Sequence, residues 1–388
     1  MTPREWRAVH ISYYQEDRDA LILGAVRPLL ARVAPDVDTA YFVRHWRRGP
    51  HLRVVFEATT EAFREVVEPA VEELVGEYLR RCPSAGPVPS EAELLPVHRK
   101  LAESEAEQGS LTPFYPDNAI SWAAHDRRTE VLGSETAADE LAAFYTRTNE
   151  LVFTHLAAVA AGQNRELLAL RLMLATAHTL CRHPDDPTVR RGFISFRSHA
   201  DGFLSTVDPS VRTAFDQRFA ANRELLIAQV HAVVDTFDRA GESTGGAGES
   251  DAAGGLPLVR EWVAALDPLG QRWTELAAAG LIPPPEIPDR ADGSFDELLE
   301  RSPFHRAIVG NHAYWELMFR DQRFQRYRLM LNYTYLHLAR LGIPGLGRYL
   351  LCHLAARAVE QAYGVDAEQT VLAFVAAHPN TPSGTVSR

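Results

Sequence analysis

Residues 41–56, YFVRHWRRGPHLRVVF, decide the fold of the amino-terminal part of this chain. Two runs rich in aromatic and β-branched residues flank Gly49-Pro50, which is the pattern of a β-hairpin. Strand side chains alternate between two faces, so the second run separates apolar from polar residues. The core face is expected to hold Leu52, Val54 and Phe56, and the other face His51, Arg53 and Val55. The second face is expected to line a cavity.

The hairpin concentrates positive charge on an acidic chain. The 388 residues include 51 Asp and Glu against 40 Lys and Arg, a net charge of −11. Such a cluster either binds an anionic group or pairs with carboxylates of its own fold, and residue chemistry alone favours the second. Two of its arginines, Arg47 and Arg48, lie in the turn and are expected to contact solvent. The cluster comprises Arg44, His45, Arg47, Arg48, His51 and Arg53.

The segments around the hairpin complete a small α+β layer. Residues 7–14 alternate and predict a strand, whereas residues 17–33 and 60–81 have the apolar spacing of amphipathic helices. The predicted order is β-α-β-β-α over residues 1–81. A Pro- and Ser-containing linker follows at 82–90.

Residues 90–388 are predicted to form a mainly helical second domain. Residues 110–135 read as irregular, and residues 240–255 read as a flexible surface loop because they are rich in Gly and Ser. The fold class is therefore α+β, a small layer followed by a helical body. Helices are expected at 91–107, 136–162, 164–182, 209–239, 257–280, 304–341 with a break, 344–363 and 365–377.

Composition excludes several classes of function. The acidic balance argues against nucleic-acid binding, which needs a basic surface. Cys82, Cys181 and Cys352 are far apart and form no CxxC pair, so neither a disulfide framework nor a structural zinc is expected. No apolar run reaches 18 residues and the start does not resemble a signal peptide, so we expect a cytoplasmic protein without membrane contact.

No standard catalytic signature is present: the chain has no GxSxG, HExxH or P-loop. Residues 195–201, SFRSHAD, concentrate hydrogen-bond donors and one imidazole, and are expected between helices. His199 is either structural or an acid/base group whose pKa is lowered by Arg197. The aromatic residues of 312–335 are either core packing, the default for helices, or a wall for flat substrate rings.

Together these stretches resemble the thiopeptide-type bacteriocin biosynthesis family, which is related to the elimination domain of class I lanthipeptide dehydratases. The resemblance covers most of the chain and implies an elimination-domain-like fold. Its most specific part is Gly49-Pro50-His51-Leu52-Arg53. The other matching stretches are Trp6–Tyr14, Phe42-Val43-Arg44, Arg127–Gly133 and Arg328–Arg348.

The resemblance implies one of two reactions. Eliminating members remove glutamate from glutamylated Ser or Thr, and commonly carry a His-x-x-x-Asn-Arg helix before a Gly. Counted back from Gly342, the chain has Thr334 and Leu338-Ala339 there instead. We therefore expect a pyridine synthase, which joins two dehydroalanines by a formal aza-[4+2] cycloaddition and releases water and the leader peptide. A split glutamate-eliminating lyase and a non-catalytic leader-binding subunit remain the alternatives.

The resemblance and this chemistry together assign expected roles. The partner is a leader-bearing, dehydrated, azole-containing precursor peptide, and neither a metal nor an organic cofactor is expected. His199 is the expected acid/base group, Tyr335 the expected acid or hydrogen-bond donor, and Arg197 the orienting cation. Expected substrate contacts are Arg53, His51, Ser195, Trp122 and Trp315, and expected leader contacts are Arg44, Arg47 and Arg48.

Overall fold

The computed structural model describes residues 4–181, 190–242, 256–283 and 296–379. It divides into two compact units. The first unit runs to Gln163 and also includes Ala339–Gly342, and the second comprises Asn164–Leu338 and the residues from Ile343 onward. The predicted boundary at 82–90 therefore lies inside the first unit.

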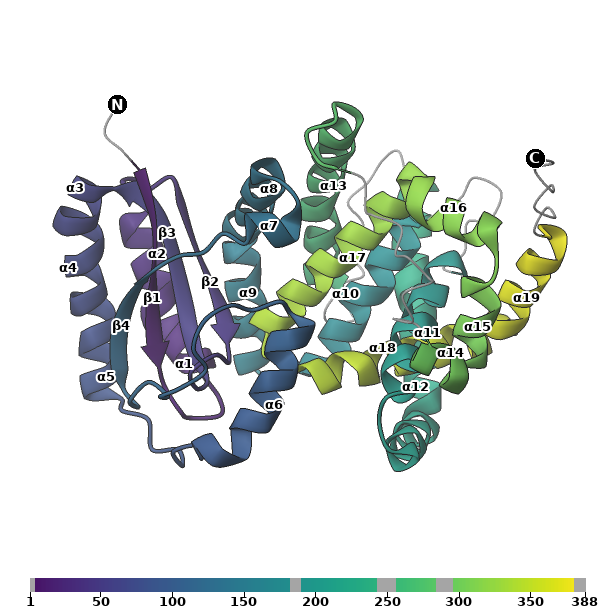
Figure 1. Cartoon of the computed structure of the whole chain (residues 1–388), viewed down its shortest axis with the longest axis horizontal. Coiled ribbons are helices and arrows are strands. Elements are labelled where there is room, and N and C mark those ends of the chain that lie inside the picture. The colour runs from purple at the N-terminus through teal and green to yellow at the C-terminus, as the bar shows by residue number, and fades with distance from the viewer. Residues whose placement is uncertain (1–3, 182–189, 243–255, 284–295, 380–388) are drawn as a thin grey trace, which may run out of the picture. The chain divides into compact units, whose positions relative to one another are not determined.

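A four-stranded antiparallel sheet forms the centre of the first unit, in the order β2-β3-β1-β4 (Figure 1). The predicted hairpin is β2–β3, which closes with His45 opposite His51. Its turn contains Arg48 and Gly49 at φ 61° and 93°, the left-handed region that glycine adopts without strain. The strands are β1 (Arg4–Ser12), β2 (Thr39–His45), β3 (His51–Thr59) and β4 (Ala119–Ala124).

Helices cover the apolar face of this sheet, as the hairpin pattern predicted. Leu52, Val54 and Phe56 are fully buried, and Phe63 of the covering helical segment packs edge-on against Trp122 of β4. Thr59 caps that segment by accepting the Ala62 N–H at 3.2 Å. The covering segments are α1 (Asp19–Leu21), a π-helical turn (Ile22–Val26) and α2 (Arg27–Val33), then α3 (Thr60–Ala62), α4 (Glu68–Ala70) and α5 (Glu77–Arg81) with π-helical turns Phe63–Val67 and Val71–Gly76.

Strand β4 corrects the prediction that residues 110–135 are irregular. Half of its six residues are alanine, which is depleted in strands, so the sequence gives only a weak strand signal. It pairs with β1, more than a hundred residues earlier, with Trp122 opposite Val9. The first unit therefore extends beyond residue 81, and it also contains α6 (Glu91–Ser104), α7 (Thr129–Leu132), α8 (Glu135–Arg147) and α9 (Asn149–Ala160). The helix predicted at 136–162 is thus two helices.

The second unit is helical throughout its described part, which confirms the predicted fold class. The expected break within 304–341 occurs twice, giving three helices. Residues 195–201 lie inside α11, not between helices as predicted. Of the predicted loop 240–255, residues 243–255 lie outside the described residues. The helices are α10 (Arg165–Leu180), α11 (Arg190–Leu204), α12 (Pro209–Glu242), α13 (Leu256–Ala278), α14 (Asp296–Arg301), α15 (Pro303–Val309), α16 (His312–Arg320), α17 (Gln322–Arg340), α18 (Gly345–Tyr363) and α19 (Ala367–Ala377).

Two features of the described residues bear on function. None of the helices there has the length and apolar character needed to cross a membrane. No group of three or more His, Cys, Asp and Glu side chains among these residues is arranged to hold a metal ion.

Candidate functional site

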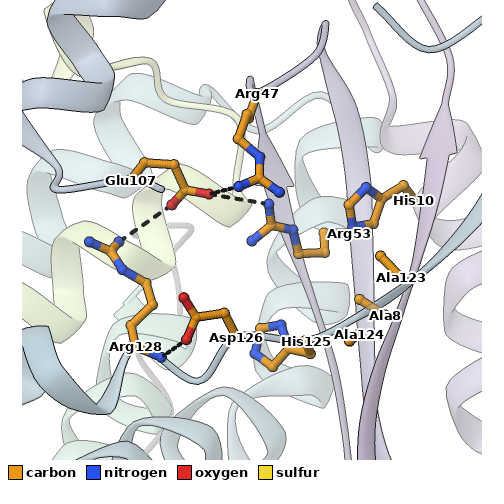
Figure 2. Close-up of a pocket in the computed structure, with 10 residues that line it drawn as sticks. All are labelled: Ala8, His10, Arg47, Arg53, Glu107, Ala123, Ala124, His125, Asp126 and Arg128. Carbon is orange, nitrogen blue, oxygen red and sulfur yellow. Dashed lines mark hydrogen bonds and ion pairs between the residues drawn. The ribbon is translucent and has the colours of Figure 1, made fainter. Parts of the chain in front are cut away.

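A cavity of ≈ 50 Å³ lies against the polar face of the sheet in the first unit (Figure 2). Strand alternation places His10 of β1 and Arg53 of β3 on this face, directly opposite each other. Glu107 enters from the segment after α6, and Arg128 from the start of α7. We call this the sheet cavity; its lining is Ala8, His10, Arg47, Arg53, Glu107, Ala123, Ala124, His125, Asp126 and Arg128.

Glu107 is the carboxylate that pairs with the arginines of the sheet cavity. Its side chain is only 7 % exposed, and its oxygens lie 3.2 Å from Arg47, 3.7 Å from Arg53 and 3.8 Å from Arg128. Arg47 and Arg53 of the hairpin therefore pair with a carboxylate of their own fold, the alternative that residue chemistry favoured. Three arginines face only two carboxylates, Glu107 and Asp126, so the cavity keeps an excess of positive charge.

The histidines around the sheet cavity contribute no charge at neutral pH. Burial, reinforced by neighbouring cationic groups, lowers the pKa of His10 to about 2, of His51 to about 3 and of His125 to about 4. His10 and His51 stack with ring centres 4.7 Å apart, and the His10 Nδ1 lies 3.0 Å from the Tyr115 hydroxyl. The positive charge of the cavity therefore comes from arginine alone.

The expected leader contacts do not form one surface. Arg44 faces the opposite side of the sheet, where it donates to Asp19 at 2.6 Å and to the Arg340 carbonyl at 3.0 Å. Arg48 donates to the Pro113 carbonyl at 2.8 Å. Arg44 lies on β2, whereas Arg47 lies in the turn that follows it. Arg47 and Arg48 are held by the fold through Glu107 and the Pro113 carbonyl, not free in solvent as the turn predicted.

The expected substrate contacts of the first unit are also divided between faces. Arg53 lines the sheet cavity. His51 is 1 % exposed and uses Nδ1 to donate to the Gly49 carbonyl at 2.9 Å. Trp122 lies on the apolar face, where its ring is 4.9 Å from the Arg7 guanidinium.

In the second unit, His199 of α11 and Tyr335 of α17, the two expected proton-transfer residues, lie within hydrogen-bond distance of each other. The His199 Nδ1 lies 2.9 Å from the Tyr335 hydroxyl, which in turn lies 3.3 Å from the Cys352 sulfur of α18. Burial lowers the pKa of His199 to about 4, with Arg348 and Arg328 acting in the same direction. Burial raises the pKa of Tyr335 well above its usual value. At neutral pH the imidazole and the phenol are therefore both uncharged, and a hydrogen bond joins them.

Arg197 is not the cation that acts on His199. Its guanidinium is held by Asp201 at 2.6 Å and Glu360 at 3.2 Å. Residues 197 and 201 are four apart on α11, so their side chains meet on one helix face. The expectation that Arg197 tunes His199 is therefore wrong. Arg348 takes that place, with its guanidinium 5.3 Å from the centre of the Tyr335 ring.

The other expected contacts of the second unit are core residues. Ser195 is 9 % exposed and lies within α11, and Trp315 is 6 % exposed. The Trp315 indole N–H donates to the Val309 carbonyl at 2.9 Å, and its ring stacks on Phe319 at 5.0 Å. Tyr327 is fully buried as well. Trp315, Phe319 and Tyr327 of the aromatic stretch 312–335 thus pack in the core, which was the first of the two alternatives, and do not form an exposed surface for flat substrate rings.

Sequence reasoning missed two groups that the structure brings together. Glu107 follows α6 without any motif, so nothing local indicates its role. His305 lies 3.0 Å from Ser198 and 2.7 Å from Ser302. The sequence did carry a signal for the second contact. Ser302-Pro303 is the pattern of a helix cap and first helical residue, and a cap residue lies beside the residue three positions later, here His305.

A second hollow, of ≈ 390 Å³, lies in the first unit where β2 and β3 meet α8. Its walls include Trp6, Glu57 and Asp139. No sequence prediction pointed to it. Neither this hollow nor the sheet cavity contains His199 or Tyr335.

Comparison with known proteins identifies the family. Residues 6–359 match the model described as lantibiotic biosynthesis dehydratase C-term. Among solved structures, the pyridine synthase TbtD from thiomuracin biosynthesis is 35 % identical with a TM-score of 0.71, over 93 % of this chain and 99 % of that one. TsrL is 21 % identical with a TM-score of 0.68, over 95 % and 98 %. No curated protein matched. The chain belongs to the lantibiotic biosynthesis dehydratase C-terminal family, as its sequence resemblance indicated.

Proposed function

We propose that this protein is a thiopeptide pyridine synthase. It would join two dehydroalanines of a linear, azole-containing peptide in a formal aza-[4+2] cycloaddition, and then release water and the leader peptide. The observation that carries the proposal is the 35 % identity to a pyridine synthase across 93 % of this chain and nearly all of that one. The replacement of the eliminating His-x-x-x-Asn-Arg pattern before Gly342 supports the same choice.

The reaction asks for two things from the protein. The first is to hold two distant alkenes together, since alignment of reacting groups can contribute roughly 7–11 kcal/mol. The second is proton transfer, because the azadiene forms from an amide that must take its iminol form. Positioned acids and bases typically supply about 10²–10⁴-fold. His199 and Tyr335 are suited to this step because they are hydrogen-bonded at 2.9 Å and neutral.

The sheet cavity is suited to binding rather than to proton transfer. Its arginines cannot give up a proton near neutral pH, but they can donate hydrogen bonds to a peptide carbonyl or a carboxylate. Arg53 is the arginine placed by the hairpin motif, and its Nε has no hydrogen-bond partner among the described residues. We assign Arg53 to holding the peptide, with Arg47 beside it.

One experiment separates the three candidate functions. Purified protein is incubated, without added cofactor, with a dehydrated azole-containing peptide and, separately, with a glutamylated peptide. Mass spectrometry should show the macrocycle and the free leader from the first peptide. Release of glutamate from the second would instead establish the eliminating lyase. Leader binding with no mass change in either peptide would establish a non-catalytic subunit.

A further inference from the structure

The last step of the proposed reaction needs two proton carriers at once. Aromatisation of the ring removes a proton from carbon, breaks a carbon–nitrogen bond and places a proton on the departing leader amide. One group must accept the first proton and another must supply the second, with no net change in oxidation state. The His199–Tyr335 pair is assigned above to the iminol step, so a separate group that accepts the carbon-bound proton would complete this later step.

A second hydrogen-bonded chain lies beside that pair. It runs from Ser198 Oγ to His305 Nε2 at 3.0 Å, and from His305 Nδ1 to Ser302 Oγ at 2.7 Å. Ser198 directly precedes His199 on α11, and His305 is close enough to lower the His199 pKa. The order is hydroxyl, imidazole and orienting hydroxyl, the arrangement in which a serine exchanges a proton with a base held by a third group.

The start of helix α15 fixes the positions of the residues in this hydrogen-bonded chain. Ser302 caps α15 and accepts the His305 backbone N–H at 3.3 Å, so the start of the helix sets the distance between the two residues. His305 is 7 % exposed, whereas Ser198 is half-buried. Burial lowers the pKa of His305, and the Asp201 carboxylate of α11 opposes this shift. The imidazole is therefore shielded, and the serine is the member that can reach a substrate.

We infer that Ser198 is a second catalytic residue, exchanging a proton with the substrate, and that His305 acts through it while Ser302 holds the imidazole. This inference rests on the proposed function and adds the second carrier that the elimination of the leader requires. In this step Ser198 takes the proton that leaves the ring carbon and passes its own hydroxyl proton to His305 Nε2, which becomes an imidazolium while Nδ1–H stays on Ser302.

The test is His305→Gln, because glutamine keeps a hydrogen-bonding group near both serines but cannot carry a proton at this pH. We expect kcat to fall by about 10²-fold or more, in line with the loss of one acid/base group. KM and the melting temperature should stay close to those of the wild type. Ser198→Ala should give a similar loss in kcat and should fold, since alanine is favoured within a helix.

The matched control is Gly202→Ala, one turn along α11. The added methyl would lie 3.7 Å from the His305 ring, an ordinary contact, and would leave both hydrogen bonds intact. It should turn over like the wild type. Folded His305→Gln and Ser198→Ala proteins that turn over within about threefold of an active wild type would overturn this inference alone. A wild type that forms no macrocycle from the dehydrated peptide contradicts the proposed function instead.

Discussion

The sheet cavity and the helical cluster around His199 both bury titratable side chains. The cavity holds charged side chains in ion pairs, whereas the cluster holds neutral side chains in hydrogen bonds. In the cavity, three arginines share Glu107 while the histidines beside them are discharged by burial. In the cluster, His199, Tyr335 and Cys352 form an uncharged hydrogen-bonded chain. Fixed charge is suited to holding a polar group, and neutral hydrogen-bonded chains are suited to moving protons. Under the proposed function, peptide binding would fall to the charged cavity of the first unit and proton transfer to the neutral cluster of the second.

The largest expected effect is on stability at acidic pH. Burial holds the pKa of His10, His51 and His125 at about 2, 3 and 4, below the value of about 6.5 in the unfolded chain. The unfolded state therefore binds more protons, and stability is full above pH 6.5 and is lost as pH falls toward these values. Each histidine contributes up to about 1.4 kcal/mol per pH unit.

Urea unfolding at pH 7, 6 and 5 measures this loss. His125→Gln should reduce the slope by about one proton without removing it. A free energy of unfolding that stays constant from pH 7 to pH 5 would show that these histidines are not held neutral. The charge of the sheet cavity could then not be assigned to arginine alone.

The next effect is on turnover. Tyr335→Phe removes the hydroxyl between His199 and Cys352, and His199→Gln removes the imidazole. Each should lower kcat by about 10²-fold or more, because one proton carrier is lost. Leader affinity, measured by fluorescence polarisation, should remain unchanged. Normal turnover in both variants would remove His199 and Tyr335 from the mechanism.

A comparable effect, on stability instead of turnover, is expected for Glu107→Gln. The change leaves the Arg47, Arg53 and Arg128 guanidinium groups without their shared carboxylate and should destabilise the protein by about 2–4 kcal/mol. Added salt should restore part of this, because it screens the repulsion among the arginines. Unfolding in urea at low and high NaCl measures both. A salt-independent loss would indicate that packing, not charge, is what Glu107 supplies.

The smallest effect is expected at the surface. Asp139 pairs with Arg127, but its side chain is 64 % exposed. Exposed ion pairs contribute less than about 1 kcal/mol, so Asp139→Asn should shift the urea midpoint only slightly. A loss as large as that of Glu107→Gln would mean that burial does not distinguish the two carboxylates.

Local pattern predicted the parts of the fold that depend on neighbours in sequence. The hairpin alternation placed Leu52 and Arg53 on opposite faces, because that signal is short-range. Strand β4 was missed because its pairing with β1 is long-range and its composition is neutral. Within the site, His199 and Tyr335 were proposed through the family resemblance, whereas Glu107 depends on a tertiary contact that no spacing shows.

The position of β1 between β3 and β4 has a consequence for how the chain matures on the ribosome. The sheet cannot be finished until residues 119–124 have emerged, long after the hairpin is available. A nascent or truncated chain ending near residue 81 would display β1 as an open edge, which other chains can extend. Aggregation of short amino-terminal fragments is therefore expected, and synthesis past residue 124 is the point at which that hazard ends.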